Sequence, residues 1–425
     1  MKNFSKDIKL LIVAQATSLV GGAILNFALA LFVLELTGAV EVFSAILAAA
    51  AIPTALLGPL GGVIADRLDK KKTIVFLDFC KGIIGLGMVT ILFLGIEPVA
   101  WLAILMLVMS ISMTLYSPVI SASVPALIDD EGLISANGAI QGINAISEFI
   151  APVIAGFLMI QLPIEPILLL GVALFWGSAI TELWINIPYQ KMKSNVGVVK
   201  TVMGDLKEGF VYIIKGNPKL LKLAISVAFF GAIVNPLFMV GIPYVTQSVF
   251  GLGQFHIGIG QGAIAIAMLI GGIGIGLVKK WLHLDTVGIW MGAMSLAILI
   301  LVVALNFSGL IGFAIFIFGF IVMLVIGTCF NIFAFSLIQE ETPDHLIGKV
   351  FAMIGAIAGL LVPVGLQGIG LLFNLFTGNL STFFLLIFGV LLFIAVVVYM
   401  IFRNEERPVA KEETSDEELS AEVQV

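Results

Sequence analysis

Twelve long apolar stretches follow one another along this chain, and all 21 of its Lys and Arg residues fall on one predicted side of them. A helix that crosses a bilayer needs about 20 mostly apolar residues, so a chain of 425 residues can hold twelve such helices with short connections. Backbone groups in lipid must find their hydrogen bonds within the segment, which favours helices over strands for runs this long. The pattern therefore predicts an all-α membrane protein with twelve transmembrane helices.

The predicted spans leave little of the chain for soluble structure. Only 11% of the residues are charged and 60% are hydrophobic, whereas a soluble domain carries about a quarter charged residues. The spans that we predict cover residues 8–36, 42–65, 73–95, 99–126, 136–160, 166–187, 220–249, 255–280, 286–306, 309–338, 347–376 and 380–403.

The distribution of basic residues predicts the orientation of the spans. Lys and Arg lie before the first span, after the even-numbered spans or near the same membrane face, with Lys81 placed inside the third span close to its inner end. The opposite loops carry the acids Glu41, Glu97 and Glu165 but no basic residue. Because basic loops stay on the cytoplasmic side, we expect a multi-pass protein with both termini in the cytoplasm.

A basic segment, residues 188–219, divides the chain into two similar parts. We predict an N-terminal six-helix half over residues 1–187 and a C-terminal six-helix half over residues 220–403. The tail, residues 404–425, is acidic, poor in large apolar residues and predicted to be disordered. The linker is predicted to form an amphipathic helix on the inner membrane surface. Its apolar residues at helical spacing are Val199, Val202, Leu206, Phe210 and Ile213.

The two halves resemble a diverged repeat. Gly62 corresponds to Gly274 and Pro152 to Pro363, at offsets of 212 and 211 residues. Parallel repeats of this kind place the substrate site at the interface of the halves, near the middle of the membrane. Glycine pairs spaced by four residues allow close helix contact, and five of the six pairs fall in the second, fifth, eighth and eleventh spans. The pairs are at 58/62, 138/142, 258/262, 272/276, 288/292 and 355/359.

The loop after the second span carries a recognisable motif. Residues 62–72 read GVIADRLDKKK, which resembles the G-x-x-x-D-R-x-G-R-[RK] signature of major facilitator transporters, with Asp69 in place of the usual Gly. Gly62 permits close helix packing, while Asp66 at a helix end can form a contact that exists in only one conformer. Membrane anchoring and helix capping are the alternative. We interpret Gly62, Asp66 and Arg67, together with Pro152, as conformational gating residues.

Several further segments narrow the resemblance. The chain resembles the macrolide efflux proteins of the drug:proton antiporter branch along nearly its whole membrane-embedded length. The segments that carry the resemblance are AQATSL at 14–19, LTG at 36–38, PALI at 125–128, ISEFIAP at 146–152, KEGF at 207–210 and GKVF at 348–351. The Ala151-Pro152 pair departs from the Gly-Pro usual in the antiporter motif of helix 5. The resemblance implies the major facilitator fold, alternating access, a bacterial cytoplasmic membrane and export of macrolide-like drugs, as in multidrug efflux.

Two predicted helices carry a polar stripe along one face. Gln15, Ser18, Gly22 and Asn26 follow helical spacing in the first span, as do Asn137, Gln141, Asn144 and Glu148 in the fifth. Polar residues at membrane depth face a cavity or a partner helix, so hydrogen bonding between helices is the alternative to substrate contact. The residues that we predict to line a substrate cavity are Gln15, Asn26, Gln141, Asn144, Asn331 and Gln367.

Glu148 is the predicted proton-coupling residue. It lies about 12 residues into the fifth span, roughly 18 Å from the inner end at 1.5 Å per residue. A carboxyl group at that depth can exchange a proton when the cavity opens, although a helix partner that holds it is the alternative. Glu35 and Glu182 lie nearer to span ends, where exposure at the membrane interface is expected, and Asp78 with Lys81 is expected to form a local pair.

Other classes of site are not indicated. The chain has no GxxxxGK[ST] phosphate loop, and its three histidines are scattered, so neither ATP hydrolysis nor a metal or nucleophile site is predicted. We expect no enzyme activity, no cofactor, no nucleic acid partner and no obligate protein partner. The hypothesis is a proton-gradient-driven efflux transporter for an amphiphilic small molecule, with the substrate, protons and the lipid bilayer as its partners. Alternatives are an exporter or flippase of a lysolipid or siderophore, and a non-transporting membrane sensor.

Overall fold

The computed structural model describes residues 5–96, 98–128, 130–188 and 198–403. Twelve of its helices are long and apolar enough to cross a membrane, which confirms the predicted all-α architecture with twelve spans. The predicted disordered tail, residues 404–425, and residues 189–197 of the linker lie outside the described part of the chain.

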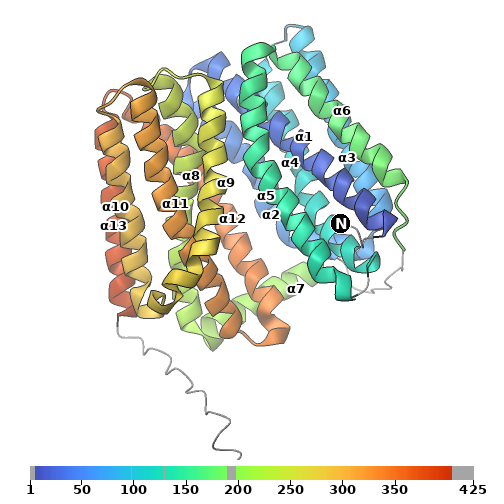
Figure 1. Cartoon of the computed structure of the whole chain (residues 1–425). Coiled ribbons are helices and arrows are strands. Elements are labelled where there is room, and N and C mark those ends of the chain that lie inside the picture. Colours follow the sequence, from blue (N-terminus) through green and yellow to red (C-terminus); the bar gives the residue numbers. More distant parts are fainter. Residues whose placement is uncertain (1–4, 97, 129, 189–197, 404–425) are drawn as a thin grey trace, which may run out of the picture.

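The spanning helices form two groups that lie side by side (Figure 1). The first group contains α1 (Lys6–Thr37), α2 (Val40–Arg67), α3 (Lys70–Phe93), α4 (Pro98–Ser123), α5 (Asp130–Gln161) and α6 (Ile164–Leu183). The second contains α8 (Pro218–Ser248), α9 (Gln254–Val278), α10 (Val287–Ala304), α11 (Gly309–Glu340), α12 (Asp344–Leu375) and α13 (Leu380–Phe402). Helix α7 (Val198–Val211) lies between them at one end of the molecule, on the side of the N-terminus (Figure 1).

Local sequence explains where several helices begin and end. The side chains of Ser5, Asp69 and Asn379 cap α1, α3 and α13 by accepting a hydrogen bond from a backbone N–H of the first turn. Gly38 ends α1 with a φ of 61°, a left-handed conformation that glycine adopts without steric cost. The short connections that follow keep consecutive spans antiparallel.

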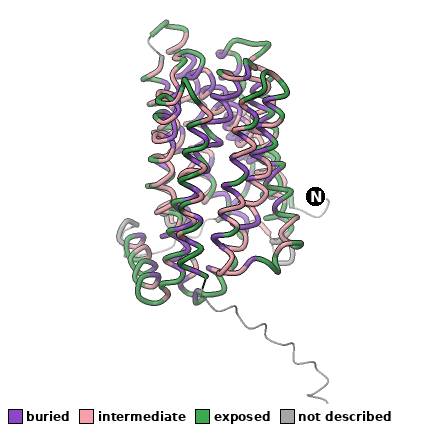
Figure 2. Tube along the Cα trace, turned by 90° about the vertical axis from the view of Figure 1, so that its left-hand side faces the viewer, coloured by how far each residue is buried: buried purple, intermediate pink, exposed green. Residues whose placement is uncertain are grey.

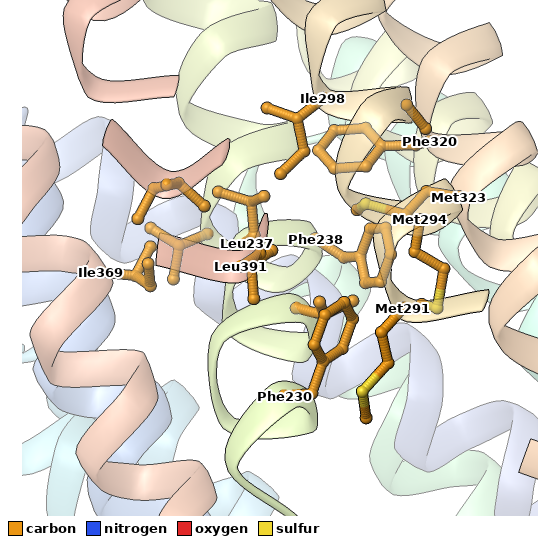
Figure 3. Packing of buried hydrophobic residues seen from close by; sticks show 14 of the residues in the cluster. Phe230, Leu237, Phe238, Met291, Met294, Ile298, Phe320, Met323, Ile369 and Leu391 are labelled. Atoms are coloured by element: carbon orange, nitrogen blue, oxygen red, sulfur yellow. The ribbon is translucent and has the colours of Figure 1, made fainter. Parts of the chain in front are cut away.

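Each group of helices packs around apolar side chains. In the second group the core is rich in aromatic and methionine residues, and Figure 3 shows Phe238, Phe320, Met294 and Met323 meeting between helices. On the outer faces of the bundle, exposed residues alternate with partly buried ones along the helices (Figure 2). Many of the exposed residues are large and apolar, as with Ile273 at 83% exposure, and lipid would cover such a surface.

Helix α7 packs against α12 and α2. Val202 is buried in this contact, and the Nζ of Lys349 on α12 lies 2.7 Å from the Oε2 of Glu208. Met203 and Phe210 on α7 instead line a 720 Å³ hollow beside α12. The amphipathic pattern of the linker thus gives a helix that binds the protein with one part of its apolar surface and leaves another part exposed.

Candidate transport site

The two helix groups meet closely at one end of the molecule. Helices α5 and α9 cross where a Cβ added to Gly258 would lie 2.5 Å from the carbonyl oxygen of Pro152, and one added to Gly262 would lie 3.1 Å from that of Phe149. Helices α2 and α12 meet in the same way, because a Cβ on Gly359 would lie 3.0 Å from the Cα of Ala55. These glycines therefore allow backbone contact between the groups on the side away from α7.

The same helix faces are open nearer to α7. Gly138 and Gly142 lie on the α5 face that carries Phe149, and Gly276 lies on the α9 face that carries Gly258, by the 100° helical repeat. A Cβ added to any of these three open-side glycines would meet no atom of the described residues within 4 Å. The α5–α9 seam is therefore packed at one end and open at the other, and Pro152 lies in the packed part.

Three of the predicted cavity residues come together on α1 and α5. The Nε2 of Gln15 donates to the Oδ1 of Asn144 at 3.2 Å, and the Nδ2 of Asn144 donates to the Oε1 of Gln141 at 3.1 Å. Gln15 is buried, whereas Gln141 is exposed. The stripe therefore forms a hydrogen-bonded path from an exposed surface of α5 into the bundle, and it also joins the two helices.

Asn26 lines a cavity of 220 Å³ between the two helix groups. The walls come from α1, α2, α8 and α9, and the polar groups that they contribute are the amides of Asn26 and Gln261. The other lining residues are Ala23, Phe27, Ala30, Leu31, Phe43, Leu47, Met239 and Pro243. A cavity with apolar walls and two amides suits a ligand that is mostly apolar with a few hydrogen-bonding groups.

Asn331 lines a second cavity of 450 Å³ inside the C-terminal group. Asn235 and Thr328 share it, and Met239 lines both this cavity and the one at Asn26. Sequence reasoning missed Asn235, although an Asn-Pro pair within an apolar span was a usable signal. Gln367 lines neither cavity, and its buried Oε1 has no hydrogen-bond partner among the described residues.

The predicted gating and coupling residues differ in how far the structure describes them. The Nη2 of Arg67, the last residue of α2, donates to the Oγ1 of Thr201 on α7 at 3.2 Å. Gly62 and Asp66 belong to α2, but the surroundings of Gly62 and the side chain of Asp66 lie outside the described part. Glu148 is exposed on α5 next to Phe149 of the packed seam, and within the described residues its carboxylate makes no hydrogen bond or ion pair.

A buried ionic cluster inside the N-terminal group corrects two expectations. Glu182 is fully buried, not exposed at the interface, because α6 packs against α1 and α3 and Tyr116 of α4 reaches its carboxylate. Lys81 lies in the middle of α3 and not near its inner end, where it forms the expected ion pair with Asp78. Tyr116 OH donates to the Oε1 of Glu182 at 2.9 Å. Sequence reasoning paired Asp78 with Lys81 but treated Glu182 separately, although ionisable residues within two spans of one half were a signal.

Comparison with known proteins agrees with this architecture. The model of the family described as Major Facilitator Superfamily matches residues 11–366. Macrolide efflux protein A of Streptococcus pyogenes is 29% identical over 404 residues, which cover 92% of this chain and 95% of that protein. Macrolide efflux protein A of Enterococcus faecalis is 28% identical over 324 residues, which cover 74% of this chain and 96% of that protein.

Solved structures share the fold at low sequence identity. The nucleoside transporter NupG superposes with a TM-score of 0.69 at 15% identity, covering 94% of this chain and 99% of that one. A bacterial homologue of the iron transporter ferroportin superposes with a TM-score of 0.69 at 17% identity, with the same coverage.

Proposed function

Because this chain belongs to the Major Facilitator Superfamily, we propose that it is a proton-gradient-driven efflux transporter that exports an amphiphilic small molecule. The observation that carries the proposal is the similarity to Macrolide efflux protein A, which extends over 92% of this chain. A macrolide is therefore the substrate class to test first. The two amide-bearing cavities support an amphiphilic ligand, because their walls are mostly apolar and carry few hydrogen-bonding groups.

Transport would proceed by alternating access between the N-terminal half, residues 1–187, and the C-terminal half, residues 220–403. The α5–α9 and α2–α12 contacts close one end of the interface, while the open glycines leave the α7 end apart. If the α7 end is cytoplasmic, as the basic residues predict, this conformer receives substrate from the cytoplasm. Rocking of the halves would then break the packed contacts and close the open seam.

The orientation has a direct test. Reporter fusions near Gly38, Gly95, Gly251 and Gly378 are expected outside, and fusions near Lys71 and Glu405 inside. An inverted pattern would contradict the cytoplasmic placement of α7 and with it the direction of transport.

The substrate class is tested by a resistance and accumulation screen in an efflux-deficient bacterial host. Expression of the protein should lower the intracellular level of erythromycin, a macrolide, and raise the concentration that inhibits growth. The matched control is the Pro152→Ala variant at equal abundance, which should export more slowly because Pro152 lies in the packed α5–α9 contact. Unchanged macrolide accumulation would refute the macrolide class, and loss of lysolipid or siderophore from the cells would favour those alternatives.

Proton coupling is proposed to involve Glu148. Its carboxylate is exposed on α5 beside the seam that must open and close, so a protonation change there would bear on the contact between halves. Glu148→Gln keeps the size and hydrogen-bonding capacity of the side chain and removes the titratable group. In proteoliposomes we expect loss of accumulation driven by a pH gradient, with substrate exchange retained. Wild-type coupling at normal thermal stability would remove Glu148 from the mechanism.

A further inference from the structure

The N-terminal half buries three ionisable side chains that the cavity and the gate leave unexplained. Asp78 and Glu182 have 0% relative exposure and Lys81 has 1%. Asp78 and Lys81 are on α3, and Glu182 is on α6, which packs against α3. Charges this far from water are costly unless they are paired and hydrogen-bonded.

The hydrogen bonds around the cluster satisfy some oxygen atoms and leave others without partners. The Nζ of Lys81 donates to the Oγ of Ser18 at 2.8 Å and forms an ion pair with Asp78, and Ser18 Oγ donates to the Oδ1 of Asp78 at 2.8 Å. Lys81 also lies over the ring of Tyr116, with Nζ 4.0 Å from the centroid. The Oδ2 of Asp78 and the Oε2 of Glu182 are buried and have no hydrogen-bond partner among the residues that the structure describes.

The charges in the cluster do not balance if both acids are ionised. Two carboxylates would face one ammonium, and the neighbouring groups that act electrostatically on Glu182 are Asp78, Lys81 and Tyr116. Asp7, a further acid on α1, does not join the cluster, because it lies at the exposed start of the helix and accepts a hydrogen bond from the backbone N–H of Asn186 at 2.9 Å. A single proton on Glu182 removes the excess negative charge, because a buried carboxyl group takes the neutral form unless a cation pairs with it, and Lys81 is paired with Asp78.

We propose that Asp78, Lys81 and Glu182 form a proton-binding site in which Lys81 pairs with Asp78 and Glu182 carries one exchangeable proton. This inference rests on the proposed proton-driven export, and it adds a site inside the N-terminal half to Glu148 on α5. When Glu182 releases its proton, the buried cluster holds two carboxylates and one ammonium. The free-energy cost of the unpaired negative charge then favours a rearrangement of the helices that carry the cluster.

The proton site and the predicted cavity residues on α1 and α5 have helix α1 in common. Ser18, which bridges Lys81 and Asp78, lies one turn from Gln15, which donates to Asn144 on α5. A movement of α1 relative to α3 would therefore alter the hydrogen bonds of Ser18 to Asp78 and Lys81. It would at the same time alter the hydrogen bond from Gln15 to Asn144. This mechanical link is how occupancy of the proton site would reach the transport path.

Infrared spectroscopy of the full-length protein in lipid tests the site directly through the C=O stretch of a protonated carboxyl group. Wild type at neutral pH is expected to give such a band. Glu182→Gln and Asp78→Asn should each lose it, because the remaining acid then pairs with Lys81 and ionises. The double variant Asp78→Asn with Lys81→Met should keep the band, because Glu182 then has no cation of the cluster to pair with.

This pattern of lost and retained carboxyl bands distinguishes a proton-binding site from a merely structural cluster. Glu35→Gln, a carboxyl substitution elsewhere on α1, is the control and should keep the band. A wild-type spectrum without the band, or a band that survives in Glu182→Gln and Asp78→Asn, would overturn the proposed proton site. If a single variant fails to fold, the charge-balanced double variant and the wild type still decide the question.

Coupling is tested in proteoliposomes with erythromycin as the probe. Glu182→Gln should retain exchange of the probe and lose at least tenfold of its pH-gradient-driven accumulation, whereas Glu35→Gln should behave as wild type. Normal gradient-driven accumulation in Glu182→Gln would overturn the role of the site in transport. If wild type moves no probe at all, the macrolide proposal fails, and the infrared pattern alone decides whether the proton site exists.

Discussion

Replacing Gly258 with Ala should shift the protein away from the conformer described here. The new Cβ would lie 2.5 Å from the carbonyl oxygen of Pro152 and 3.3 Å from the Cα of Val153, both of which are backbone atoms. Ordinary contact begins at 3.4 Å, so α5 and α9 would have to separate by about 0.9 Å at the crossing. No flexible side chain can move aside to relieve this overlap.

The expected size of the effect follows from the cost of overpacking. Extra methyl groups in a packed contact cost about 1–3 kcal/mol. The clash exists only while the packed end of the α5–α9 seam, away from α7, is closed. The cost therefore lowers the population of this conformer relative to the competing one by a factor of about 5 to 150. The variant should remain folded, since the competing conformer relieves the contact.

The assay is a distance measurement between spin labels on the open side of the seam. Asn137 on α5 and Leu277 on α9 are both exposed and suit labelling, in a background where Cys80 and Cys329 are replaced. Wild type should give mainly long distances, and Gly258→Ala should increase the population of short ones as the α7 end closes.

Gly274→Ala is the matched control. Gly274 is on the same helix, about 160° around the axis from Gly258 by the helical repeat, and a Cβ there would meet no atom within 4 Å in the part of the chain that the structure describes. Its distance distribution should match wild type. Equal distributions for Gly258→Ala and Gly274→Ala would refute the argument that backbone contact at the α5–α9 crossing holds this conformer.

Three further perturbations have defined outcomes. Asp66→Asn should slow transport while leaving abundance and equilibrium binding of erythromycin largely unchanged, because it removes a charge at the end of α2; unchanged transport rates would reduce the motif to a topology anchor. Lys349→Met should loosen α7 from α12 by removing the 2.7 Å pair with Glu208, seen as faster proteolysis of the linker, while the melting temperature changes little because the pair is partly exposed. Gly288→Ala should lower the melting temperature of the purified protein, because its Cβ would overlap the backbone of Tyr399 on α13; wild-type stability would contradict the close α10–α13 packing.

The number and type of spanning helices followed from the sequence, because a lipid-embedded segment must be long, apolar and internally hydrogen-bonded. The structure confirms twelve such helices, with boundaries within a few residues of those predicted. The glycine pairs likewise identified the helices that meet between the groups. These features are local or periodic in the chain, so one sequence is enough to read them.

Tertiary structure decided which of the polar residues meet. Periodicity placed Gln15 and Asn144 on one face of each helix, but the hydrogen bond between them depends on how α1 and α5 are rotated against each other. For the same reason the sequence misjudged Glu182, whose position near a helix end suggested exposure.

Depth along one helix can be counted from the sequence, but burial depends on what neighbouring helices place around a residue. Three helices surround Glu182, and α3 and α4 bring Lys81 and Tyr116 to it from 101 and 66 residues away in the chain. Likewise, all six glycine pairs look alike in the sequence, yet only packing distinguishes the closed end of the seam from the open one. Long-range contacts of this kind depend on helix rotation and crossing, which no local pattern specifies.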